Sequence, residues 1–108
     1  MVQLWIAIES TLDIQAAVID VTTKKVWSTG EKKFTDNPTD AWVTLARFPA
    51  SDLASMRTAT VNIPETIANV DNLMAVYRFV GDTMLIGDPV PVAKMNRAKS
   101  GIWGAWLW

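Results

Sequence analysis

The chain has 108 residues, the size of one domain with a single hydrophobic core. Half of the residues are hydrophobic, 19% are charged, and the formal net charge of −1 gives no overall field that would draw the protein to nucleic acid or to an anionic membrane. There is no cysteine and no histidine, so a disulfide-built scaffold is excluded and the usual general base, thiolate nucleophile and commonest transition-metal ligands are missing.

The N-terminal third predicts short strands separated by turns. Residues 2–8 carry apolar side chains at every even position, which predicts a first strand with one apolar face. Residues 14–21 predict a second strand, and residues 26–34 a short hairpin that turns at Ser28-Thr29-Gly30. We expect no signal peptide, because the apolar start lacks a basic region and is interrupted at Gln3 and Glu9.

Two further strands are predicted after the turn-rich segment 35–40. Residues 41–48 alternate in polarity and end at Pro49, and residues 49–56 are interpreted as a loop. Residues 57–64 alternate again, with Ala59, Val61 and Ile63 expected to face inward.

The stretch 73–92, LMAVYRFVGDTMLIGDPVPV, predicts a central hairpin of two apolar segments joined at Gly81-Asp82. Leu73, Ala75, Tyr77 and Phe79 fall on one side at period two. Few polar residues remain on the other side, so we expect one face to be covered by a second sheet and the other in part by a partner chain.

About seven short strands with no sustained helical period are typical of an all-β sandwich or barrel, and we predict an antiparallel β-sandwich with an extended C-terminal tail. Residues 1–92 are assigned to the sandwich domain and residues 93–108 to the tail. All eleven acidic residues precede residue 93, whereas Lys94, Arg97 and Lys99 follow it. The two parts therefore differ in charge.

The tail ends in apolar residues that a free terminus would not leave in water. Each buried aromatic covers roughly 150 to 250 Å², worth about 25 cal/mol per Å² before the cost of ordering the segment. We therefore expect the tail to bind a neighbouring subunit or a major shell or tail protein. The predicted partner-binding residues are Ile102, Trp103, Trp106, Leu107 and Trp108.

No pattern in the chain predicts an enzyme, a cofactor or a metal site. No phosphate-binding loop, calcium loop or nucleophile elbow occurs, and most acidic residues fall in predicted turns. Asp20 is the exception, an acid within an apolar strand, for which an edge or outward position is the simpler explanation.

The aromatic side chains outside the tail are interpreted as core. A carbohydrate platform would need them on one exposed face, which alternation does not establish. Base stacking by the basic, Trp-rich tail and insertion of that tail into a membrane interface are weaker interpretations, because the body is acidic and the tail has no amphipathic period. The residues assigned to the core are Trp5, Trp27, Phe34, Trp42, Phe48, Tyr77 and Phe79.

Several segments resemble a class of small phage virion proteins with immunoglobulin-like sandwiches. They are VWSTGEKKF, the approach to AWVTLARFP, the strand RTATVNIP and the hairpin LMAVYRFVGDTMLIGDPVPV, all from Val26 onward and together about two thirds of the chain. The resemblance implies an immunoglobulin-like sandwich and a structural role without catalytic residues. The Trp-rich end has no counterpart in that class.

The sequence therefore predicts a non-enzymatic subunit of a bacteriophage virion, assembled in the host cytoplasm, in the capsid as a decoration or cement protein or in the tail or fibre apparatus. Its expected partners are copies of itself and a major capsid or tail protein, with no nucleic acid and no membrane. Two alternatives remain open: a stand-alone carbohydrate- or peptide-binding β-sandwich module, and an accessory domain of a secreted bacterial system.

Overall fold

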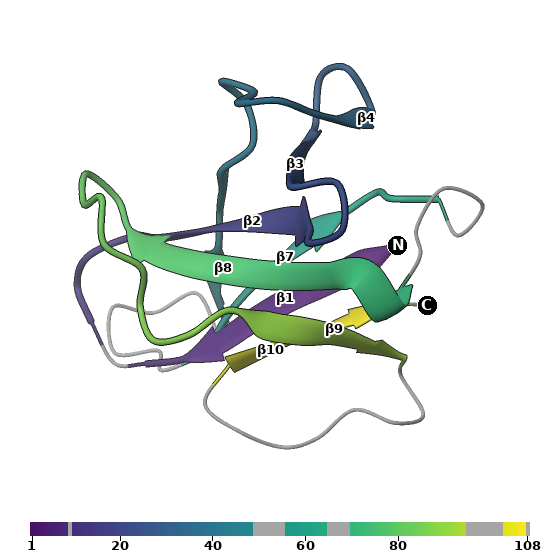
Figure 1. Ribbon diagram of the computed structural model, residues 1–108. Coiled ribbons are helices and arrows are strands. Elements are labelled where there is room, and N and C mark those ends of the chain that lie inside the picture. The colour runs from purple at the N-terminus through teal and green to yellow at the C-terminus, as the bar shows by residue number, and fades with distance from the viewer. Residues whose placement is uncertain (9, 49–55, 65–69, 95–102, 108) are drawn as a thin grey trace.

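The computed structural model describes residues 1–8, 10–48, 56–64, 70–94 and 103–107. Within them the regular structure is almost entirely β, with one short 3₁₀ turn, η1 (Val70–Asn72), and the prediction of an all-β chain is confirmed (Figure 1). The strands are β1 (Val2–Ala7), β2 (Ile14–Asp20), β3 (Lys25–Ser28), β4 (Lys33–Thr35), β5 (Val43–Thr44), β6 (Ala46–Phe48), β7 (Met56–Val61), β8 (Leu73–Phe79), β9 (Val90–Lys94) and β10 (Trp103–Leu107).

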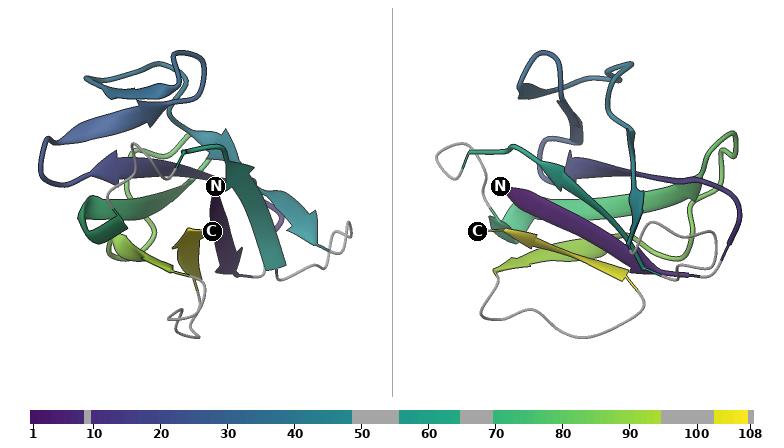
Figure 2. Two further views of the ribbon diagram at one scale, coloured as in Figure 1. Left: turned by 90° about the vertical axis from the view of Figure 1, so that its right-hand side faces the viewer. Right: turned by 180° about the vertical axis from the view of Figure 1, so that it is seen from behind.

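The described strands form one ten-stranded mixed sheet in the order β4-β3-β2-β8-β9-β10-β1-β7-β6, with β5 paired to β2. The predicted sandwich has two separate sheets, whereas here hydrogen bonds run continuously from one layer to the other. Figure 2 shows the two layers from the side, with β2, β8 and β9 in one and β10, β1 and β7 in the other. The layers are joined through the parallel pair β9–β10.

A segment that changes layers also links β7 of one layer to β2 of the other. Residues 41–48 were predicted as one strand, but β5 pairs with β2 and β6 pairs with β7. Leu45 between them donates its backbone N–H to the Ile14 carbonyl, 2.9 Å away, so the chain crosses from one layer to the other without losing its hydrogen bonds. The sheet thus closes on itself. If β5 and β6, which run in the same direction, are counted as one strand, the closed circuit has seven strands: these two together with β2, β8, β9, β10, β1 and β7. An odd number cannot alternate strictly antiparallel, and the parallel β9–β10 pair is the required exception.

The core lies in the interior of the closed sheet, and its residues are those that the alternation in the sequence predicts to face inward on β1 and β8. The even positions of β1, the predicted apolar face, are buried, as are Leu73, Ala75 and Tyr77 of the predicted inner face of β8. Ile63 and Leu45 complete the packing from the ends of neighbouring strands. The buried cluster comprises Val2, Leu4, Ile6, Ile14, Ala16, Val18, Trp27, Leu45, Val61, Ile63, Leu73, Ala75, Tyr77, Val92 and Ala105.

The outer face of β8, which was expected to need a partner chain, is covered in part by the protein itself. Val76 packs with Ala17 and Ala41 in a second buried cluster, and Ile19, Val26 and Trp42 lie against it. The segment that leads into β5 provides this cover because β5 is hydrogen-bonded to β2. At this face the apolar alternates of the strand therefore do not require another subunit.

The predicted central hairpin is confirmed for its first strand and wrong for much of its second. β8 pairs with β9 only at Met74–Pro91 and Ala75–Val90, and residues 80–89 form a long loop. The loop begins with a turn in which the Asp82 N–H donates to the Phe79 carbonyl, and it returns where the Ile86 N–H donates to the Tyr77 carbonyl. Apolar residues of this loop, Met84 and Leu85, were assigned to a strand and lie outside one.

The β3–β4 hairpin projects from the body, as Figure 1 shows at the top. The rings of Trp27 and Phe34 meet edge to face with centroids 5.1 Å apart, which anchors the hairpin to the core. Asp40 closes its turn: its carboxylate accepts hydrogen bonds from the Ser28 hydroxyl at 2.8 Å and the Gly30 N–H at 2.5 Å. These bonds, the one from Ser28 first, hold the pKa of Asp40 below its usual value.

Candidate interaction surface

The predicted partner-binding segment is a strand of the body over 103–107, and the assignment of residues 93–108 to an extended tail is wrong for this stretch. β10 lies between β1 and β9, antiparallel to the first and parallel to the second. The backbone of Trp103, Trp106 and Leu107 therefore pairs within the chain's own sheet. Ile102 and Trp108 lie outside the described residues. The backbone of this apolar segment is hydrogen-bonded on both sides, because β10 is the strand that joins the two layers.

Two contacts fit β10 to its neighbours. The Tyr77 hydroxyl, buried in the core, donates to the Gly104 carbonyl at 2.5 Å and accepts from the backbone N–H of Trp5 at 3.3 Å. A Cβ at Gly104 would lie 2.8 Å from Nε1 of Trp5, so the indole packs where any other residue would place its side chain. Burial raises the pKa of Tyr77, and the hydrogen bond from Trp5 opposes that shift only in part.

Exposed apolar side chains gather instead on two loops at one end of the molecule. The exposed fractions are 75% for Met84, 49% for Val80, 42% for Leu85 and 59% for Leu12. The first three lie in the β8–β9 loop and Leu12 in the β1–β2 connection, and both segments are at the same end in Figures 1 and 2. The Val80 N–H donates to the Asp13 carbonyl at 3.0 Å, which joins the two segments. We call this surface, Leu12, Val80, Met84 and Leu85, the loop end.

Hydrogen bonds from the body hold the loop end in place. Arg57, fully buried on β7, donates from Nη1 to the Leu12 carbonyl at 2.7 Å and from Nη2 to the Ser10 carbonyl. Arg47 on β6 donates to the Thr11 carbonyl at 2.7 Å. Burial, with the nearby charge of Arg47, lowers the pKa of Arg57. Two arginines thus fix three successive carbonyl positions of the connection, so Leu12 is presented on a braced segment.

The loop end carries charges of both signs. Asp13, Asp82 and Asp88 are exposed, and residues 80–89 contain no lysine or arginine. Arg47, 3.8 Å from the Asp13 carboxylate, and Arg57, bound to the Ser10 and Leu12 carbonyls, offset much of this negative charge. Asp82 also orders the loop, since its Oδ1 accepts the Met84 N–H at 3.0 Å. The loop end is therefore an apolar surface with carboxylates and guanidinium groups beside it.

The other residues singled out from the sequence have structural partners. Asp20 is the last residue of β2, and its Oδ1 accepts the N–H groups of Thr22 and Thr23, so it caps a turn. Trp5, Trp27 and Tyr77 are buried as predicted, and Phe34, Trp42 and Phe79 are partly buried. The side chain of Phe48 lies outside the description.

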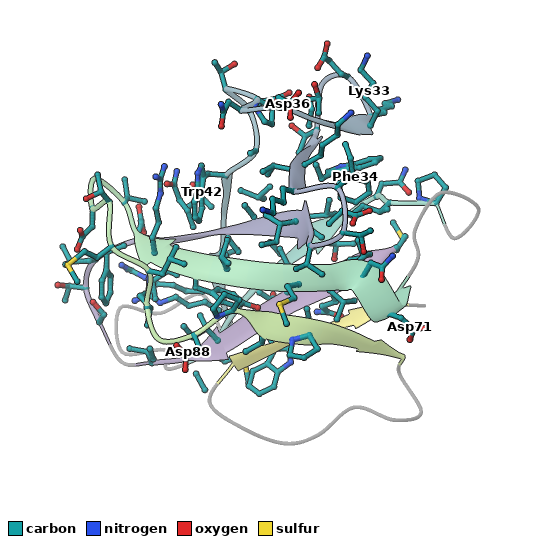
Figure 3. All side chains as sticks on the ribbon, viewed as in Figure 1. Lys33, Phe34, Asp36, Trp42, Asp71 and Asp88 are labelled. Carbon is teal, nitrogen blue, oxygen red and sulfur yellow. The ribbon has the colours of Figure 1, made fainter. Side chains whose placement is uncertain are left out.

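Trp42 would be the natural platform for a sugar, but one face of its ring is taken. The Arg78 guanidinium stands 3.9 Å from the ring centroid, and its Nε donates to Oε1 of Gln15. Figure 3 shows Trp42 above β2, beneath the projecting hairpin. A carbohydrate would have to displace the arginine to stack on that face.

Among the described residues there is no group of three or more Asp or Glu side chains placed to hold a metal ion. The same part of the chain contains no helix that is long and apolar enough to cross a membrane. Comparisons with protein-family models, with curated proteins and with solved structures found no match.

Proposed function

We propose that this chain is a non-enzymatic structural subunit that binds other proteins through its loop end, and that it serves in a bacteriophage virion. The observation that carries the proposal is the ordered display of Leu12, Val80, Met84 and Leu85 on braced loops. Exposed apolar side chains that are scattered singly need no explanation, whereas several gathered at one end of a molecule indicate a candidate interaction surface.

The placement in a virion follows from the resemblance of residues 26–92 to small phage structural proteins. A capsid decoration or cement role and a tail or fibre role are both compatible with a small all-β subunit. The resemblance also implies an immunoglobulin-like sandwich. That fold has two antiparallel sheets, and the parallel β9–β10 pair and the link through β5 and β6 differ from it, so the proposal keeps the role and does not depend on that topology.

The partner surface in this proposal is the loop end in place of residues 102–108. Strand exchange through the C-terminal segment would require β10 to leave its own sheet, which would uncover the hydrogen-bonding edges of β1 and β9. Binding through the loop end requires no such opening.

The test is co-expression of the chain with the products of neighbouring reading frames, followed by co-purification. Met84→Lys should reduce the recovered partner about tenfold or more, because it places a charge on the most exposed side chain of the apolar surface. Thr60→Lys, an exposed position on β7, is the matched control and should not change recovery. Full recovery with Met84→Lys would remove the loop end as the partner surface.

The stand-alone carbohydrate-binding module is tested by titrating sugars against tryptophan fluorescence. A saturable change that is lost in Trp42→Ala, on a chain that never associates with any protein, would favour that function over the structural one.

A further inference from the structure

The hydrogen-bonded path of the sheet ends on the projecting hairpin. Among the described strands β4 pairs with β3 alone, whereas β6 at the other end of the path is linked through β5 to β2. In Figure 2 β3 and β4 lie on the side of β2 away from β8, so the outer edge of β4 faces away from the body. A bare strand edge is a template on which another strand can pair.

The turn before β4 fixes which backbone groups lie on that edge. The Lys32 N–H donates to the Ser28 carbonyl at 2.9 Å, so the backbone groups of Ser28 point toward β4. Ser28 is opposite Lys33, and opposite residues alternate between hydrogen-bonded and non-hydrogen-bonded pairs. Trp27 and Phe34 are therefore a non-hydrogen-bonded pair. The N–H and C=O of Phe34 point outward from the hairpin, where no described residue pairs with them.

The β2–β3 turn leads independently to the same orientation. The Lys24 N–H donates to the Asp20 carbonyl at 2.8 Å, so the backbone groups of Asp20 point toward β3. Val26 lies one residue beyond the position opposite Asp20, so its own groups point away from β2 and toward Thr35 of β4. Phe34 is the neighbour of Thr35 and again faces outward.

We propose that the β4 edges of two copies of this chain pair antiparallel about a two-fold axis at Phe34. The N–H of each Phe34 donates to the carbonyl of the other, and two hairpins become one four-stranded sheet. This register sets Lys33 opposite Thr35 of the second copy, and Lys32 and Asp36, which flank the strand, come opposite each other twice. The inference concerns a surface other than the loop end and does not depend on it.

The charges of this segment permit it to meet its own copy. Like charges directly opposite each other destabilise a sheet, and in this register no lysine is opposite a lysine and no carboxylate opposite a carboxylate. A lysine on an edge strand commonly opposes pairing, but Lys33 here meets a threonine. The positive and negative side chains of residues 20–40 are equal in number: Lys24, Lys25, Lys32 and Lys33 against Asp20, Glu31, Asp36 and Asp40.

The position of the hairpin leaves room for a second copy. It projects from the body in Figure 1, and the Phe34 ring is held against Trp27, so the backbone of β4 forms the edge. Figure 3 labels Lys33 and Asp36 at the top of this projection. A two-stranded hairpin is marginally stable by itself, so pairing also stabilises the projection. A two-fold contact uses both edges, so it closes as a dimer and does not propagate into a fibre.

Disulfide trapping tests the register, because the chain has no cysteine of its own. Lys33 and Thr35 of the second copy form a non-hydrogen-bonded pair with Cα atoms about 4.5 Å apart, within reach of a disulfide. Identical residues lie diagonally, roughly 7–8 Å apart. Under mild oxidation, Lys33→Cys mixed with Thr35→Cys should therefore cross-link to a dimer about tenfold faster than either variant by itself.

The matched control is Lys25→Cys, an exposed position on the neighbouring strand β3. Mixed with Lys33→Cys or with Thr35→Cys, it should give only the slow cross-linking of random collisions. A mixture of Lys33→Cys and Thr35→Cys that cross-links no faster than this control would overturn the proposal.

Sedimentation equilibrium tests the contact without a covalent bond. Thr35→Lys sets a lysine opposite Lys33 in both halves of the interface, so the dissociation constant of the dimer should rise about tenfold. Thr39→Lys adds the same charge to the same projection at an exposed position outside β4, and it should dimerise like the wild type. Circular dichroism melts establish that both variants fold. Equal dissociation constants for the two variants, or a wild-type chain that stays monomeric, would overturn the pairing.

The loop end is distinguished by Met84→Lys. This change should leave the dimer intact, and Thr35→Lys should leave the co-purification of another protein intact. If Met84→Lys weakens the dimer and Thr35→Lys does not, copies join through the loop end and the pairing through β4 is wrong. If the dimer forms as described but Met84→Lys changes no recovery of a partner, the proposed role of the loop end fails and the β4 contact stands.

Discussion

The C-terminal strand and the β8–β9 loop are both apolar stretches, but the first pairs within the sheet and the second lies outside any strand. The sequence GIWGAWLW suggests a surface that needs a partner, and its residues 103–107 are the strand between β1 and β9. The sequence VGDTMLIGDP suggests part of a buried hairpin, and it leaves Met84 three-quarters exposed. Hydrophobicity alone therefore did not decide which of the two stretches pairs as a strand.

The difference lies in the hydrogen-bonding partners available to each backbone. β10 has a strand edge on each side, β1 and β9, so its backbone donors and acceptors are paired within the sheet. The β8–β9 loop contains Gly81, Asp82, Gly87 and Pro89, and it satisfies part of its backbone by local turns instead. Turn chemistry outweighed the apolar run between those residues.

The largest expected effect comes from removing β10. Deletion of residues 100–108 should abolish cooperative thermal unfolding and reduce solubility, because β1 and β9 lose their pairing and the core is opened at Ala105. Circular dichroism melts and soluble yield measure this. A truncated chain that melts cooperatively near the wild-type temperature would show that the segment is dispensable for the fold.

The next largest loss of stability is expected from Gly104→Val. The new side chain meets the Trp5 indole at about the position of the close Cβ contact, and overpacking of this kind costs roughly 1–3 kcal/mol. Urea denaturation measures the loss. The double variant with Trp5→Leu should lose less free energy of unfolding than the two single variants lose together, because the smaller leucine side chain makes room for the atoms added at position 104. Strict additivity would contradict the direct contact.

Tyr77→Phe should destabilise the protein by about 1–3 kcal/mol. The change removes the donor to the Gly104 carbonyl and the acceptor of the Trp5 N–H, while the ring still fills the core. The free energy of unfolding in urea is the measurement, and an unchanged value would mean that the hydroxyl contributes nothing to the join between β8, β1 and β10.

The same residue gives a pH dependence whose sign follows from burial. Because the pKa of Tyr77 is raised in the folded chain, folding favours the neutral phenol, and that contribution is complete below the ordinary pKa of 10.0 and is lost as pH rises above it. Tyr77 is the chain's single tyrosine. The free energy of unfolding of the wild type should therefore fall more steeply above pH 10.0 than that of Tyr77→Phe. Parallel curves would contradict a buried hydroxyl.

The smallest effect on stability is expected at the loop end. Met84→Lys should change the free energy of unfolding by less than about 0.5 kcal/mol, because the side chain is 75% exposed. The same change should abolish association with a partner. β10 should therefore govern folding with little direct role in binding, whereas the loop end should govern binding with little effect on folding.

The all-β class, the inner faces of β1 and β8 and the projecting hairpin could all be predicted from the sequence. These features are encoded locally: side chains alternate at period two, and Asp, Asn, Gly and Pro mark the turns. The burial of Trp5, Trp27 and Tyr77 was also predictable from residue type. Asp20, interpreted from the sequence as an acid at an edge or outward position of a strand, caps a turn instead.

The pairings that link the two layers could not be predicted from the sequence. The crossing at Leu45, the parallel pairing of β9 with β10 and the bracing of the β1–β2 connection by Arg57 all join residues far apart in the chain. Local pattern cannot encode such pairings, because a strand presents the same alternation whichever neighbour accepts its hydrogen bonds. For that reason the alternation in the sequence did not reveal that residues 103–107 pair between β1 and β9, or that the exposed apolar side chains lie in the β8–β9 loop.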